Sequence, residues 1–452
     1  MLSGDRMKRI NRASIKKTIC YLRRNGIRKT CAAVRERLDR KRTEEYEWVP
    51  PTAEKLLLQS RQAEEHGYTV TFSIVVPAYR TPGNCLRELM EALLAQSYGK
   101  WELVLADASG DNSVRNIAAE YTDTRIRYIS LGQNAGIAEN TNQALAHVTG
   151  DYVGLLDHDD VLTADALYEM AKRIEEGRRA GREPWMLYSD EDKCNGDMTA
   201  FFEPNRKEDF NLDLLLSNNY ICHFLVMRTE LIQKLGFRKK YDGAQDYDLV
   251  LRAAAELKDR ENAIGHVPQV LYHWRCHSGS TAENPASKMY AYNAGGQAVQ
   301  AFADAMNWKA QVAATEHLGF YRLCYEGSPL RVSEDLGAVG GRLVSHGRIC
   351  GGRMTEEGKV FYEGLPASYS GYLHRAVLPQ DALALDIRNF EVRASLRELF
   401  REVTGLEYIM IPGTEKFDPA AIPPQENPIE LSLRLCRALR EKGYRLLYLP
   451  EY

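Results

Sequence analysis

The sequence predicts an α/β fold with a mostly parallel central sheet that is covered by helices on both faces. Short, almost continuously apolar runs alternate with segments of helical periodicity over residues 71–310. Such runs are typical of strands that are buried on both faces of a sheet. Polar residues gather after these runs, at the strand ends where parallel α/β sheets bind their ligands. The same region is therefore expected to hold both the fold and a site.

The individual elements follow from the length and period of each segment. The expected strands are residues 72–79, 101–107, 126–131, 151–157 and 185–190. The expected helices between them are residues 84–97, 112–121, 137–148 and 163–177.

Length and composition describe an ordinary globular protein of more than one domain. The chain has 452 residues, of which 44% are hydrophobic and 27% charged, and its formal net charge is −3. This length predicts two or three domains. We expect a basic helical segment with its lead-in at 1–70, a catalytic domain at 71–310 and a further domain at 311–452. The net charge argues against a nucleic-acid binder.

Cysteine usage and hydropathy predict a cytoplasmic protein. The nine cysteines are scattered and form no CxxC pair, so we expect reduced thiols without a disulfide framework or a zinc site. No apolar run approaches the roughly 18 residues of a membrane-spanning helix, and no secretory signal is visible. Any membrane contact is expected to be peripheral.

Residues 1–43 are strongly basic, with only Asp5, Glu36 and Asp39 opposing many lysines and arginines. Apolar residues recur there at helical spacing and are interrupted at 25–26, which predicts two short amphipathic helices. The segment either lies on anionic lipid at the inner face of the cell membrane or packs as a lead-in with a solvated basic face. It lacks the interleaved aromatic residues of a nucleic-acid-binding tract.

The stretch "LLDHDD" (155–160) ends an apolar strand on three carboxylates. Like charges this close need a positive partner. Asp157 and Asp159 lie two residues apart, and their oxygens suit a hard cation such as Mg²⁺ or Mn²⁺ that also binds a diphosphate. The alternative is that an aspartate, such as Asp160, caps the following helix.

A series of motifs over about 72–300 resembles the bacterial family 2 glycosyltransferases. The stretches that carry the resemblance are "FSIVVPAYRTP", "WELVLADASGDNS", "NAGIAENTNQAL", "GDYVGLLDHDD", "YSDEDK", "SNNYICHFLVMR", "GAQDYDLVLR" and "VLYHWRCHSGSTAENPASK". They are most similar to the subgroup that builds cell-surface polysaccharides such as rhamnose-containing O-antigens. The resemblance implies a GT-A fold, a Mn²⁺ or Mg²⁺ cofactor, and inverting transfer of sugar from a UDP- or dTDP-sugar to a growing, lipid-linked glycan.

The resemblance also implies residues that bind the nucleotide. The segment Pro77, Ala78 and Tyr79 matches the strand end that lies against the base. Asp107 matches the aspartate that bonds the base or ribose, with a helix cap as the alternative. Two neighbours depart from the family pattern: Arg80 stands where Asn is common, and Ala108 where a second aspartate is common.

Further donor contacts are implied around the diphosphate and the sugar. Asn134 and Gly136 match the turn that leads into a helix near the ribose and diphosphate, and a turn without ligand contact is the alternative. Asp157 and Asp159 match the pair that binds the metal and diphosphate. Glu191 and Asp192 belong to an acidic strand end that faces the sugar, or else to a solvated turn.

Asp246 matches the catalytic base, which takes the proton of the acceptor hydroxyl. A helix cap is the alternative, and Asp248 would face another side of the same helix. The family often has one histidine as a further metal ligand, and the sequence does not decide between His273 and His277. Trp274 either lines the acceptor site or packs in the core.

Residues 311–452 carry no D-x-D motif and no counterpart of the base. Two stretches, 336–353 and 435–452, resemble the second half of another family 2 unit, which implies a degenerate half-domain kept for packing, partner contact or acceptor binding. Two other functions stay open for the whole chain. A sugar nucleotidyltransferase would need a Gly-rich basic triphosphate loop, which "VVPAYRTPGN" lacks; a non-catalytic scaffold would not need the acidic motifs.

Overall fold

The computed structural model describes residues 46–276 and 289–452, together with scattered positions between 18 and 34. The chain divides into two compact units. The sheet unit comprises 45–210 and 219–302, and the C-terminal unit comprises 211–218 and 303–452 with the N-terminal residues. The expected boundaries at 70 and 310 therefore differ from these units, and the excursion at 211–218 was not expected.

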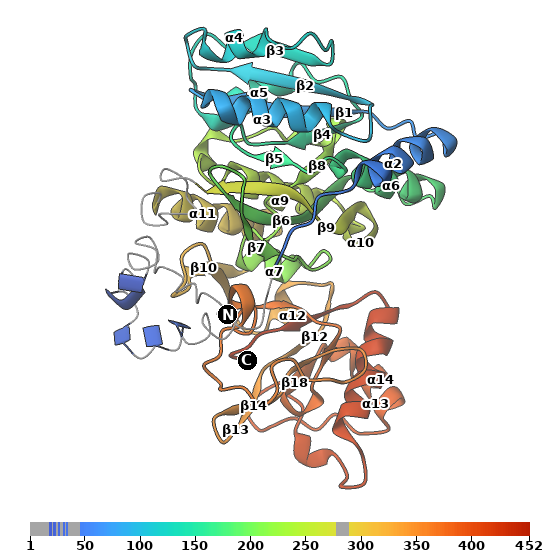
Figure 1. The fold of residues 1–452 in the computed structure, drawn as a ribbon. Coiled ribbons are helices and arrows are strands. Elements are labelled where there is room, and N and C mark those ends of the chain that lie inside the picture. Colours follow the sequence, from blue (N-terminus) through green and yellow to red (C-terminus); the bar gives the residue numbers. More distant parts are fainter. Residues whose placement is uncertain are drawn as a thin grey trace, which may run out of the picture. The chain divides into compact units, whose positions relative to one another are not determined.

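The sheet unit contains a nine-stranded sheet in the order β3-β2-β1-β4-β8-β6-β9-β5, with β7 paired to β6 (Figure 1). Its strands are β1 (Phe72–Ala78), β2 (Trp101–Asp107), β3 (Ile126–Ser130), β4 (Tyr152–Leu155), β5 (Val161–Leu162), β6 (Met186–Asn195), β7 (Phe201–Asn205), β8 (Leu225–Arg228) and β9 (Ile264–Cys276). Its helices are α2 (Ala53–Glu65), α3 (Gly83–Leu94), α4 (Ser113–Ala118), α5 (Ile137–Leu145), α6 (Ala166–Arg179), α8 (Thr229–Leu235), α9 (Gln245–Glu256), α10 (Arg260–Ala263) and α11 (Met289–Ala305).

The α/β prediction is confirmed, and each expected strand and helix corresponds to an observed element. Strands β3, β2, β1 and β4 are parallel, as are β6 and β9. Strand β8 runs antiparallel to both β4 and β6, so the complete sheet is mixed. The parallel part brings the carboxyl ends of β1, β2 and β4 to one edge, where the loops that follow them can form a site.

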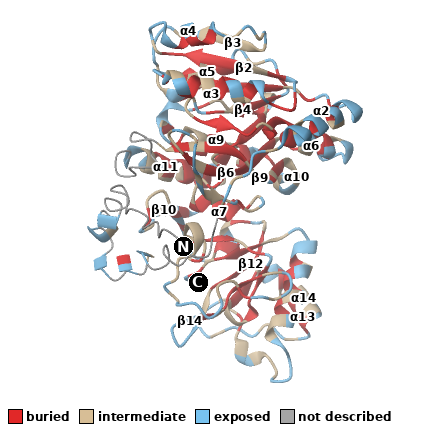
Figure 2. Ribbon diagram, in the orientation of Figure 1, coloured by how far each residue is buried: buried red, intermediate tan, exposed pale blue. Residues whose placement is uncertain are grey.

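Continuous apolar sequence places β1 and β2 in the core of the sheet unit. Both strands are buried along nearly their whole length, as Figure 2 shows. Strand β4 uses a glycine for close packing: a Cβ on Gly154 would lie 2.9 Å from side-chain atoms of Ile74 and Phe224. Fully burying one such apolar side chain contributes about 1.5–3 kcal/mol, so this core holds the strand ends in place.

The C-terminal unit has its own core. Its main sheet has the strand order β16-β19-β12-β18, in which β12 and β19 are parallel. The strands are β10 (Ala310–Ala314), β11 (Tyr321–Tyr325), β12 (Leu336–Gly340), β13 (Leu343–Ser345), β14 (Arg348–Gly351), β15 (Arg353–Met354), β16 (Gln380–Asp381), β17 (Ala384–Leu385), β18 (Phe390–Val392) and β19 (Arg445–Tyr448). The helices are α7 (Leu212–Ser217), α12 (Pro329–Val332), α13 (Arg397–Thr404) and α14 (Pro428–Glu441).

Three phenylalanines, Phe390, Phe400 and Phe417, are fully buried in that core beside α14 and β19. Burial of this kind shows that residues 311–452 pack as a globular body rather than as a tail. Glu430, which stands where a second base would be expected, lies exposed in the first turn of α14.

The N-terminal predictions are only partly covered by the described residues. The two amphipathic helices expected within 1–43 lie largely outside them. The lead-in helix expected before the first strand is α2, whose cap is the Thr52 hydroxyl, which accepts a hydrogen bond from the Lys55 backbone at 3.2 Å. Within the described part of the chain, no helix combines the length and apolarity needed to cross a bilayer.

Candidate active site

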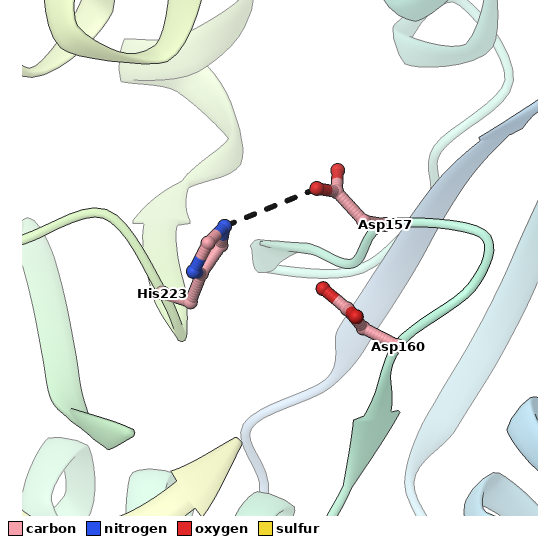
Figure 3. A group of neighbouring side chains, drawn as sticks. All are labelled: Asp157, Asp160 and His223. Atoms are coloured by element: carbon pink, nitrogen blue, oxygen red, sulfur yellow. Dashed lines mark ion pairs between the residues drawn. The ribbon is translucent and has the colours of Figure 1, made fainter. Parts of the chain in front are cut away.

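A compact group of possible metal ligands lies where β4 ends. Asp157 and Asp160 come from the turn between β4 and β5, and His223 comes from the loop before β8 (Figure 3). One ligand atom from each residue lies within 4.8 Å of the others. His223 Nε2 is 3.9 Å from Asp157 Oδ2. Segments more than sixty residues apart in the sequence thus meet at one strand end.

The turn geometry explains why Asp160 rather than Asp159 joins Asp157. The Asp160 amide donates to the Asp157 carbonyl oxygen at 3.1 Å, which folds the fourth residue of the turn back over the first. Asp159 lies outside the three-residue group, although its carbonyl oxygen accepts from Arg275 Nε at 2.7 Å. The structure therefore groups Asp157 with Asp160 and His223, and the role of Asp159 as a metal ligand stays a prediction.

Asp160 and Asp157 differ in their surroundings. Asp160 is 1% exposed and accepts hydrogen bonds from the Tyr272 hydroxyl at 2.6 Å and the Arg275 amide at 2.7 Å. Burial, followed by the charges of Asp157 and Asp159, raises the pKa of Asp160 well above its usual value. The Asp157 side chain is 52% exposed and faces solvent. Asp160 does not cap a helix, because the next helix starts at Ala166 after its cap Asp165.

His223 is held by a buried network on the other side of its ring. Its Nδ1 is 2.9 Å from Glu191 Oε2, and since a carboxylate only accepts, Nδ1 donates and Nε2 faces Asp157. The ring stacks on Tyr272 at 4.5 Å. Burial opposes the imidazolium, but interactions with Cys222 and Glu191 outweigh it and raise the pKa of His223 well above its usual value.

Glu191 is itself buried and serves as the anchor of this network. Burial alone would raise its pKa, but Lys207 at 3.5 Å and His223 lower the pKa of Glu191 to about 2. Asn205 Nδ2 donates to its other oxygen at 3.0 Å. Glu191 thus acts on the site through His223, whereas the sequence led us to expect direct donor contact. A carboxylate behind a ligand histidine is the usual way to orient that ligand.

The residues of this group fit a divalent cation. Asp157 offers a carboxylate oxygen and His223 offers Nε2, while Asp160 lies beside them with both oxygens already hydrogen-bonded. An oxygen and imidazole set of this kind suits Mn²⁺, and Mg²⁺ when oxygen ligands predominate. Binding would replace the proton on His223, because only a neutral imidazole coordinates a metal.

Asp246 lies in the first turn of α9 and connects to the same group. Asn219 Nδ2 donates to Asp246 Oδ2 at 2.8 Å, and Cys222 Sγ is 3.8 Å from that oxygen. Cys222 Sγ is also 3.5 Å from His223 Nε2, so contacts run without a break from Asp246 to the metal-ligand candidates. Asp246 is not a helix cap, because the cap position of α9 is Ala244.

Asp248 has a different task on the opposite side of the helix. It is 1% exposed and pairs with Arg238 and, at 2.9 Å, with Arg252. A carboxylate enclosed by two guanidinium groups has no room to take a proton from a substrate. The preference for Asp246 over Asp248 as the base agrees with this placement.

The nucleotide-binding candidates meet at the ends of β1 and β2. Ala78 is directly opposite Asp107 in the parallel register. Asp107 is buried and accepts from the Ser109 amide at 2.8 Å and the Tyr128 hydroxyl at 2.9 Å. Tyr79, which follows Pro77 and Ala78, is 40% exposed at the strand end. Asn112 rather than Asp107 occupies the cap position of α4, so the capping alternative is wrong.

The turn before α5 has the shape that the sequence predicts. Asn134 Oδ1 accepts from the Gly136 amide at 3.0 Å and from Asn140 Nδ2 at 2.9 Å. Gly136 has φ +102°, and a Cβ there would lie 2.9 Å from Asp242 Oδ2. The Asp242 carboxylate also accepts from the Ala138 amide at 3.3 Å, so it lies at the helix start where the resemblance implies a diphosphate.

Asp192 of β6 faces away from this group. Adjacent strand residues point to opposite faces, so Asp192 points away from Glu191. Its carboxylate is fully buried, 2.5 Å from His273 Nδ1 and 2.7 Å from the Tyr46 hydroxyl. His273 is enclosed by the rings of Trp48 and Phe201 at 4.4 and 4.6 Å. The structure therefore does not bring His273 to Asp157, nor Asp192 to a position open to a donor.

Two further predictions have separate outcomes. His277 lies outside the described residues, so its role as a metal ligand stays a prediction. Trp274 is partly buried against the core, with its ring 5.7 Å from that of His223 and 5.5 Å from Lys193 Nζ. That place beside the site is compatible with both the acceptor and the packing interpretations.

Sequence reasoning missed His223, Asn219 and Asp242. The first two lie in "SNNYICHFLVMR", a stretch that carried the family resemblance without any assigned role. A histidine among such a series of motifs was the available signal. Asp242 precedes "GAQDYDLVLR" and offered no signal of its own.

Residues 73–236 match the model of Glycosyl transferase family 2. Over these residues the chain is similar to family 2 glycosyltransferases. A curated relative, O-antigen biosynthesis protein RfbC of Myxococcus xanthus, is 36% identical over 234 residues, which cover 50% of this chain and 17% of the relative. The uncharacterized protein y4gI of Sinorhizobium fredii is 39% identical over 235 residues, covering 50% of this chain and 25% of that protein.

The glycosyltransferase domain is thus one part of much longer relatives, since the chain spans a quarter or less of both. Among solved structures, Staphylococcus aureus TarS 1–349 in complex with UDP-GlcNAc matches with a TM-score of 0.42 and 19% identity, over 52% of this chain and 66% of that one. That likeness is too distant to carry an argument. The family match and the mixed α/β sheet with its strand-end site agree with the GT-A fold that the resemblance implies for the sheet unit.

Proposed function

We propose that the sheet unit transfers a sugar from a UDP- or dTDP-sugar to a growing, lipid-linked cell-surface glycan, with inversion and with a divalent cation. One observation carries the proposal: Asp246 is joined through Cys222 to the group of His223 and Asp157. A base and a metal-ligand group within one site are what an inverting transfer from a nucleotide sugar requires.

The chemistry divides between the two ends of this site. Asp246 accepts the proton of the acceptor hydroxyl while that oxygen bonds to the anomeric carbon of the donor. The bond from this carbon to the diphosphate oxygen breaks, and the nucleoside diphosphate leaves with the bonding electrons. Because the hydroxyl attacks opposite the leaving group, the configuration inverts. A cation on Asp157 and His223, when bound, would stabilise the charge that develops on the diphosphate.

Other groups of the site orient these two ends. Asn219 donates to Asp246 Oδ2 and leaves Oδ1 for the proton. Glu191 fixes the face of His223 that points to Asp157. Asp107 and Tyr79 stand at the strand end where the nucleotide base and ribose are proposed to bind. The proposed donor site therefore extends from β2 to the turn after β4.

The acceptor class rests on relatives rather than on the geometry. RfbC is described as an O-antigen biosynthesis protein. The Escherichia coli protein WfgD is 30% identical over 95 residues, which cover 21% of this chain and 37% of WfgD, and is described as a UDP-Glc:alpha-D-GlcNAc-diphosphoundecaprenol beta-1,3-glucosyltransferase. The WfgD description supports a lipid-linked saccharide as the acceptor, and the RfbC description supports O-antigen as the kind of glycan. We propose that the protein meets this acceptor at the cytoplasmic membrane face. Trp274 is the proposed acceptor-binding aromatic.

Binding of the protein to that membrane face is proposed to use residues 1–43, whose excess of Lys and Arg suits anionic lipid. Co-sedimentation with vesicles containing anionic phospholipid tests this. The full chain should sediment, and a variant without residues 1–43 should stay in the supernatant. Equal sedimentation of both proteins would contradict the membrane role.

The donor is tested by a thermal-shift panel of nucleotide sugars with and without Mn²⁺. A UDP- or dTDP-sugar should raise the unfolding temperature, and more so with Mn²⁺, because ligands that bind only the folded state stabilise it. Release of UDP or dTDP on addition of a saccharide acceptor should follow. Formation of pyrophosphate from a nucleoside triphosphate and a sugar phosphate would instead identify a nucleotidyltransferase and overturn the proposal.

A further inference from the structure

Helix α7 interrupts the glycosyltransferase domain and belongs to the other unit. Residues 211–218 are part of the C-terminal unit, whereas the chain before and after them is part of the sheet unit. The helix packs against β16 and β11, and all of its residues are buried. A six-residue helix of this kind is not stable alone, so its place is fixed by what it packs against.

Polar contacts anchor both ends of α7 within the C-terminal unit. At the start, Asn211 Nδ2 donates to the Asp381 carbonyl at 3.1 Å, and the Asp381 amide donates to Asn211 Oδ1 at 2.9 Å. At the end, the Ser217 hydroxyl lies 3.2 Å from the Pro379 carbonyl oxygen, which shares this donor with the Asp213 carbonyl oxygen of the same helix at 3.0 Å. The two bonds between Asn211 and Asp381 resemble the reciprocal bonds of a short strand pair, and they hold the start of the helix against β16.

An ion cluster around the buried Asp213 adds to this anchor. Arg445 of β19 donates to Asp213 Oδ2 at 2.6 Å, to Asp335 Oδ2 at 2.8 Å and to Asp381. Arg445 thus ties α7 to two other segments of the unit. Removing one partner of a buried pair leaves an uncompensated charge, so the cluster resists displacement of the helix.

The segments on both sides of α7 meet again in the sheet unit. Lys207 lies before the helix, and its fully buried ammonium group donates to the carbonyl oxygens of Ile221, at 2.5 Å, and of His223 after the helix. It also pairs with Glu191 at 3.5 Å. The chain thus leaves the sheet unit and returns to it, and the Lys207 side chain links the two ends of this excursion.

The re-entering residues are those that orient the proposed base. Asn219 follows the α7 segment directly, and it donates to Asp246 at 2.8 Å while its Oδ1 accepts from the Cys222 amide at 3.3 Å. Two peptide bonds separate the Ser217 anchor from Asn219. A residue this close to a fixed point has little freedom of its own.

We infer that the C-terminal unit positions the catalytic base: α7 is a tether that holds Asn219, and Asn219 holds Asp246. The inference rests on the proposed function, in which Asp246 is the base. Asn211, Ser217 and Arg445 are positioning residues, since their contacts described above lie within the C-terminal unit. Loosening α7 should lower kcat and leave the donor KM nearly unchanged, because Asp107 and Tyr79 belong to other strands.

The test compares Asn211→Ala with Asn427→Ala in the full chain. Both asparagines cap a helix of the C-terminal unit, Asn211 for α7 and Asn427 for α14, so both variants lose a cap. Only Asn211 also holds α7 to Asp381. Hydrogen–deuterium exchange of peptides covering 218–224 gives a readout that does not need activity, and kcat and donor KM give the second.

Asn211→Ala should speed exchange in 218–224 and lower kcat by between about 10- and 100-fold with an unchanged donor KM, as for a misplaced catalytic group. Asn427→Ala should do neither. Ser217→Ala, which removes one bond, should act in the same direction to a smaller extent and serves if Asn211→Ala fails to fold.

Unchanged exchange in 218–224 of a folded Asn211→Ala protein would overturn the inference even if activity fell. Equal effects of Asn211→Ala and Asn427→Ala would overturn it as well, because they would reflect stability alone. If exchange changes as expected but the wild-type chain transfers no sugar, the proposed function fails while the tether from α7 to 218–224 stands. The two failures are therefore distinguishable.

Discussion

Two carboxylate clusters of the molecule differ in the cation that the protein supplies. In the C-terminal unit, three aspartates surround Arg445, namely Asp213, Asp335 and Asp381. In the sheet unit, Asp157 and Asp160 meet His223. A guanidinium keeps its charge at any ordinary pH, whereas an imidazole can give up its proton to a metal ion. The first cluster therefore stabilises the fold only, whereas the second can bind a metal ion.

A group of acidic residues alone is therefore not sufficient to indicate a metal site. Whether a cluster can bind a metal depends on whether the nearby cation keeps its charge and on whether one carboxylate is exposed. Asp157 is 52% exposed, while Asp213 is 3% exposed in its side chain. Each of the following predictions tests one side of this contrast.

Among the variants of the two clusters, Asp157→Ala should have the largest effect on activity. Metal-dependent release of nucleoside diphosphate should fall roughly 100- to 1,000-fold, because the site loses its solvent-facing ligand. The unfolding temperature should stay nearly constant, since a half-exposed carboxylate contributes little to packing. Asp159→Ala is the matched variant from the same turn and should cause a much smaller loss. A larger loss in Asp159→Ala would restore the original D-x-D pair and reject the geometry described above.

Glu191→Gln should weaken the metal dependence by an intermediate amount. The amide can no longer fix the His223 tautomer as a carboxylate does, so the Mn²⁺ concentration for half-maximal activity should rise about 10- to 100-fold. Activity should recover at saturating Mn²⁺.

The neighbouring Asp192→Asn variant is the control for Glu191→Gln, because Asp192 pairs with His273 on the other face of β6. It should leave the Mn²⁺ concentration for half-maximal activity unchanged. An equal shift in both variants would mean that the two carboxylate–histidine pairs are not separate, and the assignment of His223 as ligand would fall.

Asp213→Asn should change the pH dependence of stability, which is the smallest effect. Burial raises the pKa of Asp213 to about 7, against the opposing charge of Arg445. The native state therefore binds more protons than the unfolded state between about pH 4 and pH 7, and stability falls as pH rises through that window. Thermal unfolding of wild type at pH 5 and pH 8 should show this decrease, and Asp213→Asn should flatten it.

Glu430→Gln, at an exposed carboxylate of α14, is the control for that measurement and should keep the wild-type slope. A wild-type protein that becomes more stable from pH 5 to pH 8 would show that Asp213 is not protonated in the native state. The charge of Arg445 would then be balanced by an ionised Asp213.

Sequence periodicity was sufficient to predict the strands, the helices between them and the strand ends that carry Asp107 and Asp157. These features depend on local pattern and on the rule that ligands bind at carboxyl ends of parallel strands. The placement of Asp246 and Asp248 on different sides of α9 was predictable because residues two apart on a helix face different sides.

Contacts between distant segments were not predictable from spacing. The approach of Asp160 to Asp157 depends on one turn hydrogen bond, and His223 reaches Asp157 only through the pairing of β8 with β4. His273 was a reasonable ligand by motif, yet its position on β9 turns it toward Asp192 and Trp48. The transfer of α7 to the other unit left no pattern in the sequence.

We propose that Asp246 is the base of an inverting transfer. The direct test is the rate of sugar transfer by Asp246→Asn with Mn²⁺ present, with Asp259→Asn at an exposed position after α9 as the control. We expect a loss of about 100- to 10,000-fold for Asp246→Asn with donor binding retained, no loss for Asp259→Asn, and a wild-type product of inverted anomeric configuration by NMR. Unchanged transfer by Asp246→Asn, or a product with retained configuration, would contradict it.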